Sequence, residues 1–91
     1  MIHLIVYDIE DDKQRNSISK LLEIYGVRVQ RSVFECNLNE VLYKELLDKL
    51  QDLSTEDVDI RIYPLCKECF AKVMGIGEVK RFPGLRGYEI I

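Results

Sequence analysis

The sequence has no hydrophobic run long enough to cross a membrane, only one histidine, and an odd number of cysteines, three. The first absence argues against a membrane protein, and the N-terminus lacks the basic-then-apolar pattern of a secretion signal. An odd cysteine count without an export signal fits reduced thiols better than a disulfide scaffold. A single histidine excludes a histidine pair acting as general acid and base. We therefore expect a cytoplasmic protein.

A surplus of positive charge is also missing, because 13 Lys and Arg residues face 16 Asp and Glu residues and leave a net charge of -3. Taken alone, this balance argues against nucleic-acid binding. The charges are segregated along the chain. Residues 1–31 hold five basic and five acidic groups, residues 32–60 hold two basic and eight acidic groups, and residues 61–91 hold six basic and three acidic groups. Phosphate attraction decays within about 8–10 Å in ordinary salt, so locally basic ends could still bind nucleic acid. Ordinary solvated faces are the alternative explanation.

The hydrophobic pattern predicts alternating strands and helices within one domain, residues 1–91. The first half of the chain is predicted to hold a central strand over residues 2–9, a helix from Asp11 or Asp12 to its C-cap Gly26, and a long strand or bent strand pair from Val27 to Leu38. The second half is predicted to hold a helix from Asn39 to Leu53, a strand from Val58 to Tyr63 that Pro64 ends, and a short strand from Phe70 to Met74. This order predicts the α+β class with a ferredoxin-like βαββαβ fold, an antiparallel sheet with two helices on one face.

Apolar residues at helical spacing predict the inward faces of the two helices. The predicted inward residues are Ile18, Leu21, Leu22 and Tyr25 in the first helix, and Leu42, Leu46, Leu50 and Leu53 in the second. The first strand is apolar on both faces, with Leu4 and Val6 on one side and Ile5, Tyr7 and Ile9 on the other. Helices cover one face only, so we expect a homodimer to cover the other. The apolar C-terminal tail, residues 75–91, is expected to add an edge strand to its own sheet or to pack on the partner subunit.

Asp8 is the first candidate site residue, because it follows five apolar or aromatic residues near the end of the first strand. A carboxylate there is costly to desolvate unless it meets a cation or hydrogen-bond donors. In a two-fold dimer, Asp8 from each chain could converge on a shared Mg²⁺ or Mn²⁺. The alternative is that Asp8 caps the following turn through backbone N–H groups.

Basic residues near this acidic segment are candidates for binding phosphate, because guanidinium groups match phosphate oxygens. The candidate nucleic-acid-binding residues are Lys13, Arg15, Arg28 and Arg31. Phe34 could add a stacking face for a base, although a phenylalanine at such a position is more often part of the core. The alternative for the arginines is solvation or an ion pair with the acidic cluster.

The remaining candidate groups favour structural roles. A lone His3 on a strand is expected to be packed and hydrogen-bonded. The single C-x-x-C motif, Cys66 to Cys69, is half of a zinc site and does not have the order of a thioredoxin-like motif. A structural turn or an adventitious metal site is therefore favoured there.

Taken together, the motifs resemble the CRISPR-associated Cas-two family over residues 1 to about 74. The resemblance is carried, in order and spacing, by Tyr7-Asp8-Ile9, Asp11-Asp12-Lys13, Arg15-Asn16, Tyr25-Gly26, Arg28-Val29-Gln30, Ser32-Val33-Phe34-Glu35 and Arg61-Ile62-Tyr63-Pro64-Leu65-Cys66. It implies a ferredoxin-like homodimer with a metal-binding aspartate at Asp8. It also implies that the family's catalytic positions fall on Tyr7, Asp8, Arg15, Arg28 and Phe34. Position 17, basic in some members, is Ser17 here.

The resemblance implies a role in spacer acquisition, as the dimer that bridges two dimers of the Cas-one integrase and binds DNA. It also implies a magnesium-dependent endonuclease activity on single-stranded RNA or on double-stranded DNA. Three hypotheses stay open: a structural adaptor, which is favoured, a metal-dependent endonuclease, and a stand-alone endoribonuclease of the toxin-like type.

Overall fold

The computed structural model describes residues 1–78 and 89–90 of the chain. Its elements are β1 (Ile2–Asp8), α1 (Asp12–Tyr25), β2 (Gly26–Gln30), β3 (Val33–Asn37), α2 (Glu40–Leu53), β4 (Asp59–Leu65), α3 (Lys67–Ala71), β5 (Met74–Gly75) and β6 (Glu89–Ile90). The predicted strand between Val27 and Leu38 is therefore the bent pair β2 and β3. The order from β1 to β4 confirms the βαββαβ pattern.

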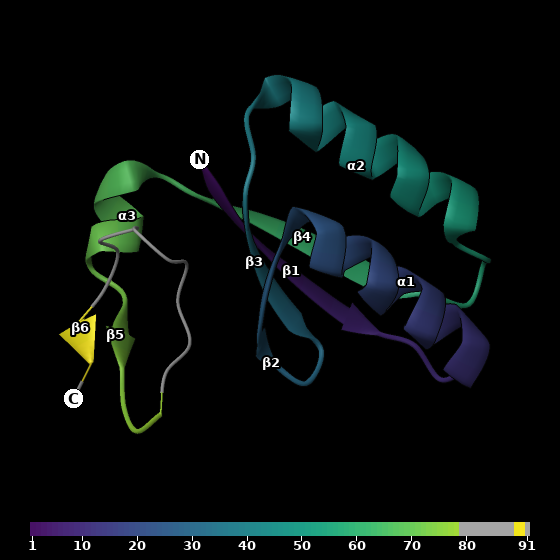
Figure 1. Cartoon of the computed structure of the whole chain (residues 1–91), viewed down its shortest axis with the longest axis horizontal. Helices are drawn as coiled ribbons and strands as arrows, with labels where there is room; N and C mark the ends of the chain where they lie inside the picture. The colour runs from purple at the N-terminus through teal and green to yellow at the C-terminus, as the bar shows by residue number, and fades with distance from the viewer. Residues whose placement is uncertain (79–88, 91) are drawn as a thin grey trace.

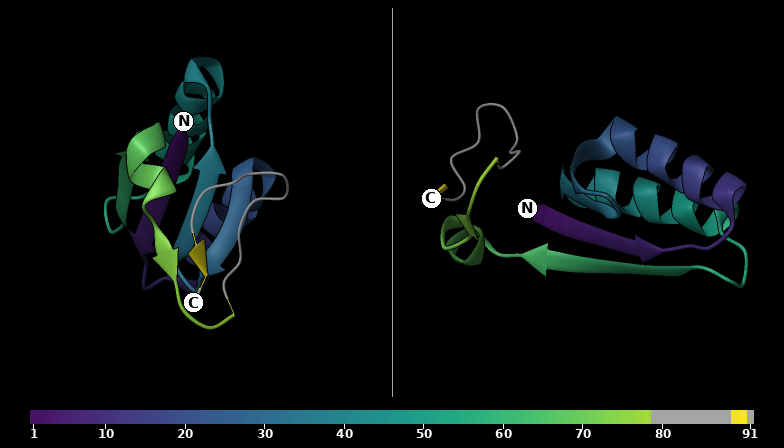
Figure 2. Two further views of the ribbon diagram at one scale, coloured as in Figure 1. Left: turned by 90° about the vertical axis from the view of Figure 1, so that its left-hand side faces the viewer. Right: turned by 90° about the horizontal axis from the view of Figure 1, so that it is seen from below.

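The main sheet has four strands in the order β2-β3-β1-β4, and each neighbouring pair is antiparallel. Figure 1 shows α1 and α2 lying beside each other across this sheet. The right-hand view of Figure 2 shows both helices on one side of β1 and β4. Among the described elements, neither long helix covers the opposite face of the sheet. The α+β, ferredoxin-like class is thus confirmed.

The core lies between the sheet and the two helices. It contains one face of β1 and β3 together with the inner faces of α1 and α2. Its fully buried side chains include Ile5, Ile18, Leu22, Phe34, Cys36, Leu38 and Leu46. In α1, the predicted inward stripe is confirmed, because Ile18, Leu21 and Leu22 are buried and Tyr25 packs against them.

The inward face of α2 is narrower than predicted. Leu46 and Leu50 are buried, but Leu42 and Leu53 are 37% and 41% exposed. Tyr43 packs against the core and stacks on the ring of His3, with 4.7 Å between the ring centroids. The stripe that faces the sheet is therefore centred on residues 43, 46 and 50, and the two outer leucines lie at its margin.

The prediction that Pro64 ends the last long strand is wrong. Strand β4 continues through Pro64, which pairs with His3, to Leu65, which pairs with Ile2. Proline lacks an N–H group, and it is tolerated in sheets mainly on edge strands, where a missing donor interrupts no ladder. β4 is an edge strand, which explains why the proline does not end it.

The predicted strand from Phe70 to Met74 is wrong over most of its length, because Phe70 lies in the short helix α3 and only Met74 belongs to a strand, β5. Its ring packs with Ile2 and against Leu65 and Val73, so burial rather than strand pairing explains its apolar character. The following β5 pairs in parallel with β6 and forms a separate two-stranded sheet. Residues 89–90 thus do not extend the four-stranded sheet. The rest of the predicted tail, residues 79–88 and 91, lies outside the described residues, and packing on a partner subunit stays a prediction.

Candidate metal and nucleic-acid site at the end of the first strand

Asp8 is the last residue of β1 and lies exposed at the end of the sheet. Within the described residues, its carboxylate has no hydrogen-bond or ion-pair partner. The alternative that Asp8 caps the following turn is therefore wrong. Asp11 caps α1 instead, because its carboxylate accepts a hydrogen bond of 2.8 Å from the backbone N–H of Gln14.

The neighbours of Asp8 across the sheet come from β4. Asp8 pairs with Asp59, and Val6 pairs with Arg61. Directly opposed residues of an antiparallel pair point to the same face, so these side chains lie on the face that α1 and α2 leave open. Arg61 donates hydrogen bonds of 3.1 and 3.4 Å to the carboxylate of Asp59, and this contact raises the pKa of Arg61. Asp59 therefore has an internal cation, whereas no cation lies against Asp8 within the part of the chain that the structure describes.

A groove of about 770 Å³ lies beside Asp8, on the side of the loop that leads into α1. Four of its lining residues are acidic: Asp8, Glu10, Asp11 and Asp57. Such a groove attracts a cation and repels phosphate oxygens. Carboxylate oxygens are suitable ligands for Mg²⁺ or Mn²⁺. Within residues 1–78 and 89–90, however, no three His, Cys, Asp or Glu side chains are grouped closely enough to hold a metal ion.

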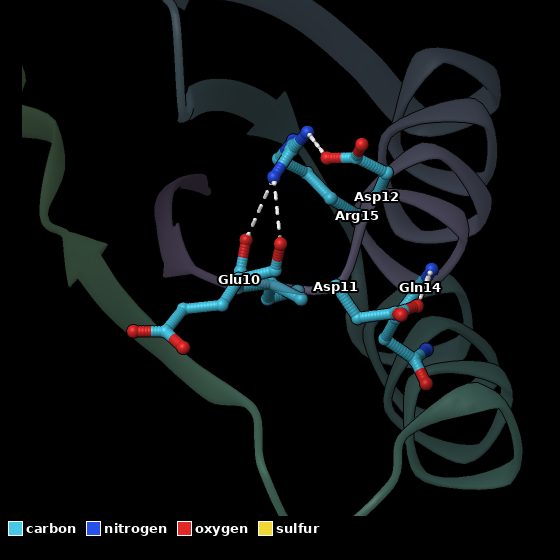
Figure 3. Close-up of polar contacts among 6 residues, drawn as sticks. Glu10, Asp11, Asp12, Gln14 and Arg15 are labelled. Carbon is cyan, nitrogen blue, oxygen red and sulfur yellow. Dashed lines mark hydrogen bonds and ion pairs between the residues drawn. The ribbon is translucent and has the colours of Figure 1, made fainter.

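Arg15 is held against the loop that follows Asp8 (Figure 3). Its guanidinium donates hydrogen bonds of 3.0 and 3.3 Å to the backbone carbonyls of Ile9 and Glu10 and forms an ion pair with Asp12. The alternative of an ion pair with the acidic cluster is thus confirmed. Because the same guanidinium fixes the backbone just beyond Asp8, Arg15 positions that loop.

Tyr7, Phe34 and Arg28 form a second group, on the covered side of the sheet. Tyr7 and Phe34 are buried, with ring centroids 6.3 Å apart, and the Arg28 guanidinium lies 5.0 Å from the Phe34 centroid. Arg28 also donates to the carbonyl of Arg31 at 2.7 Å and lies 3.5 Å from the carboxylate of Glu23. The complete burial of Phe34 makes it a core residue, and its ring offers no stacking face for a base in this chain.

Lys13 and Arg31 are exposed, whereas His3 is packed as predicted. His3 is 7% exposed, and its Nδ1 lies 3.1 Å from the carbonyl of Met1. The sequence-predicted residues thus form two separate groups, Asp8 with Arg15 and Tyr7 with Phe34 and Arg28. Sequence reasoning missed Asp59 as the neighbour of Asp8. The alternation of β4 indicates which side chains share its face, but only the register of β4 on β1 reveals the pair.

The fold and the surroundings of Asp8 define a class of small ferredoxin-like domains with an exposed carboxylate at the end of the first strand. Within this class, the chain belongs to the family of CRISPR associated protein Cas2, whose family model matches residues 1–73. This membership confirms the resemblance to the Cas-two family. Among the described residues, none of the helices has the length and apolar character needed to span a bilayer.

Three known proteins illustrate the similarity. The CRISPR-associated endoribonuclease Cas2 2 of Methanospirillum hungatei is 44% identical over 80 residues, which cover 87% of this chain and 90% of that protein. The crystal structure of the hypothetical protein TT1823 from Thermus thermophilus has a TM-score of 0.78 at 36% identity, covering 88% of this chain and 94% of that one. A chain of the "Partial Cas6-RT-Cas1--Cas2 complex" has a TM-score of 0.65 at 41% identity, and the match covers 77% of this chain and 79% of that one.

Proposed function

We propose that this protein is a homodimeric, nucleic-acid-binding subunit of CRISPR adaptation, which bridges dimers of the Cas-one integrase during spacer acquisition. The observation that carries the proposal is the similarity, at 41% identity over 77% of this chain, to a chain solved within a complex that contains Cas1 and Cas2. A surface that binds an integrase is a property of the whole domain, and the similarity extends over most of this domain. The adaptor role requires no chemistry from the chain itself.

The open face of the sheet supports the homodimer. Leu4 and Val6 of β1 are only partly buried there, and Tyr63, which pairs with Leu4, is 46% exposed. Apolar side chains on a sheet face without helices are stabilised when a second subunit covers them. A two-fold arrangement uses the same face twice, and it brings the two ends of β1 into one assembly.

The distribution of charged residues indicates which surfaces of the protein could bind nucleic acid. Lys13 and Arg31 are exposed, and Arg15 and Arg28 are partly exposed. Each guanidinium has five N–H donors, more than the internal contacts of Arg15 and Arg28 use. The acidic residues of α2 are Glu40, Glu45, Asp48 and Asp52. Phosphates should therefore avoid the outer surface of α2 and approach the molecule near α1 and β2.

A second function, magnesium-dependent endonuclease activity, is favoured by the carboxylate of Asp8, which has no partner among residues 1–78 and 89–90. One chain supplies this carboxylate at an acidic groove but no group of three ligands within its described residues, so the ion would require Asp8 from both copies. A bound Mg²⁺ or Mn²⁺ would supply an activated water and stabilise charge on the phosphate. Asp8 would hold the ion, while Arg15 fixes the adjoining loop and Arg28 contributes positive charge at β2.

One experiment separates these functions. The purified protein is combined with the Cas-one integrase of the same genomic locus, and complex formation is measured by gel filtration with light scattering. Integration of duplex DNA and cleavage of single-stranded RNA and duplex DNA are measured with Mg²⁺ or EDTA. We expect Asp8→Ala to retain the complex and integration and to abolish cleavage. The matched control is Asp48→Ala, an exposed carboxylate of α2, which should retain all three activities.

Failure to bind the integrase, or integration that does not depend on this protein, would overturn the adaptor. Cleavage that survives Asp8→Ala or EDTA would overturn the metal-dependent nuclease. Metal-dependent RNA cleavage without integrase binding would favour the toxin-like endoribonuclease. The assays are repeated over a pH series, because two carboxylates that share a site can retain a proton and exclude the metal.

A further inference from the structure

Two cysteines lie together where the four-stranded sheet ends and the C-terminal segment begins. Cys66 is the N-cap of α3, and its Sγ accepts a hydrogen bond of 3.2 Å from the backbone N–H of Cys69. Both thiols are free and exposed. The C-x-x-C motif thus opens a helix, contrary to the arrangement predicted from the sequence. This arrangement at the first turn of a helix is the one used by thiol–disulfide oxidoreductases.

The three thiols of the chain have different surroundings. A hydrogen bond from the Cys69 thiol lowers the pKa of Cys66, and the same contact raises the pKa of Cys69. Cys36, in contrast, is fully buried in β3, and this burial raises its pKa to about 12. The thiolate is the nucleophile in disulfide exchange, so these surroundings rank Cys66 first and Cys36 last in reactivity.

We propose that Cys66 and Cys69 form a reversible thiol–disulfide pair, which a low-molecular-weight disulfide such as oxidised glutathione oxidises. The Cys66 thiolate attacks one sulfur of the glutathione disulfide, whose S–S bond breaks and releases one glutathione that takes up a proton. The Cys69 thiolate then attacks Sγ of Cys66 in this mixed disulfide and releases the second glutathione. Two protein thiols are oxidised to one disulfide, and one glutathione disulfide is reduced to two thiols.

The geometry requires only a local movement for this bond. Residues three positions apart on a helical turn have Cβ atoms about 5–6 Å apart, and a disulfide needs about 3.5–4.5 Å. The movement is confined to the first turn of α3, in front of the buried Phe70. Because Phe70 packs with Ile2 of β1, the disulfide would close next to the anchor that attaches α3 to the main sheet.

The test uses the full chain, reduced and freed of metal with EDTA, and then incubated with oxidised glutathione near pH 7. After acid quenching and alkylation, mass spectrometry identifies each thiol. We expect the wild-type protein to lose two hydrogen atoms, with Cys66 and Cys69 protected and Cys36 still a thiol. Cys69→Ser should accumulate one glutathione on Cys66, and Cys66→Ser should react at least several-fold more slowly. Cys36→Ala is the matched control and should oxidise like the wild type.

Oxidation of Cys66→Ser at the wild-type rate would overturn the proposal, as would a wild-type product that contains only mixed or intermolecular disulfides. Serine is also a good N-cap, so Cys66→Ser should preserve α3. Circular dichroism of each variant checks this directly. The result does not depend on nucleic acid or on an integrase, so the proposed redox pair and the proposed function can fail independently.

Discussion

Carboxylates of the same type have different roles in this protein because their immediate partners differ. Asp11 binds a backbone N–H and begins a helix, and Asp59 binds the guanidinium of Arg61. Asp8 lies directly opposite Asp59 in the ladder between β1 and β4, and it has no partner within the described residues. An exposed carboxylate without a partner can accept a cation without first breaking an internal bond. At the residue scale, the absence of a competing contact is what makes Asp8 the candidate ligand.

His3 should make the stability of the protein depend on pH. Burial, the largest influence, lowers the pKa of its imidazole below the ordinary value of 6.5, and the nearby N-terminal charge adds to the effect, against the hydrogen bond to Met1. Between the folded-state pKa and 6.5, the unfolded chain therefore binds more protons than the folded one. Stability should fall as pH decreases through this window, by about 1.4 kcal/mol for each unit by which the pKa is lowered.

Urea unfolding at fixed protein concentration checks this prediction. It is measured at about pH 7.5, 6.5 and 5.5, on both sides of the ordinary histidine pKa. His3→Phe keeps a flat ring for stacking on Tyr43 and removes the titration, so its stability should be level over the window. The chain has no second histidine to complicate the comparison. The effect of Glu45, whose pKa is lowered by hydrogen bonds from Tyr25 and Lys49, is lost only as pH falls below 4.5. If the free energy of unfolding of His3→Phe changes with pH as steeply as that of the wild type, the prediction is contradicted.

At the scale of elements, local patterns predicted the two long helices and the long strands, whereas pairing and packing decided the remainder. The cap residue Asn39 was predicted from local hydrogen-bond chemistry, and Asp11 was one of the two candidates predicted for the first helix. The continuation of β4 through Pro64 could not be predicted in this way, because it depends on β4 lying at the edge of the sheet. The same reason applies to the site, where Asp8 was predicted from its own strand but Asp59 depends on a register between distant segments.

Gly26, where α1 meets β2, should not tolerate a side chain. Its φ of -164° is open to any residue, so the constraint is space. A Cβ at this position would lie 2.3 Å from the backbone oxygen of Glu35 and 2.5 Å from Sγ of Cys36. Since a backbone atom must move, Gly26→Ala should destabilise the fold by about 1–3 kcal/mol.

Thermal unfolding of Gly26→Ala measures this cost. For a domain of this size, each kcal/mol corresponds to a decrease of about 4–8 °C in Tm. Ser17→Ala is the matched control, because it adds no volume and changes an exposed position of α1. A Gly26→Ala protein as stable as the wild type would show that β3 moves away at no cost.

At the scale of the whole molecule, the two faces of the main sheet differ in cover and in charge. The helices cover one face of the sheet (Figure 2), and α2, one of these two helices, contains four acidic residues. The other face presents Leu4, Val6 and Tyr63 near Asp8 and Arg61. The net charge of -3 is thus an average over surfaces of different charge.

Val6→Lys should prevent dimerisation. The substitution places an ammonium group in the middle of the open face, and removing a charged group from water costs several kcal/mol even when a carboxylate is nearby. A cost of that size raises the Kd of the dimer by at least about 100-fold. Gel filtration with light scattering at micromolar concentration should give a dimer for the wild type and a monomer for Val6→Lys.

Ile24→Lys is the matched control for this experiment. It introduces the same charge at a side chain of α1 that is 77% exposed, and it should leave the dimer intact. A wild-type monomer, or a Val6→Lys protein that still dimerises, would show that the open face is not the interface.

The central position of β1 also determines the order of events during synthesis. β1 leaves the ribosome first, but its two neighbours, β3 and β4, begin only at Val33 and Asp59. One edge of β1 therefore stays unpaired until residues 59–65 have been synthesised. Contacts between distant segments slow folding, and unpaired apolar strands favour aggregation. β1 is thus the strand of the main sheet that stays incompletely paired for longest during synthesis.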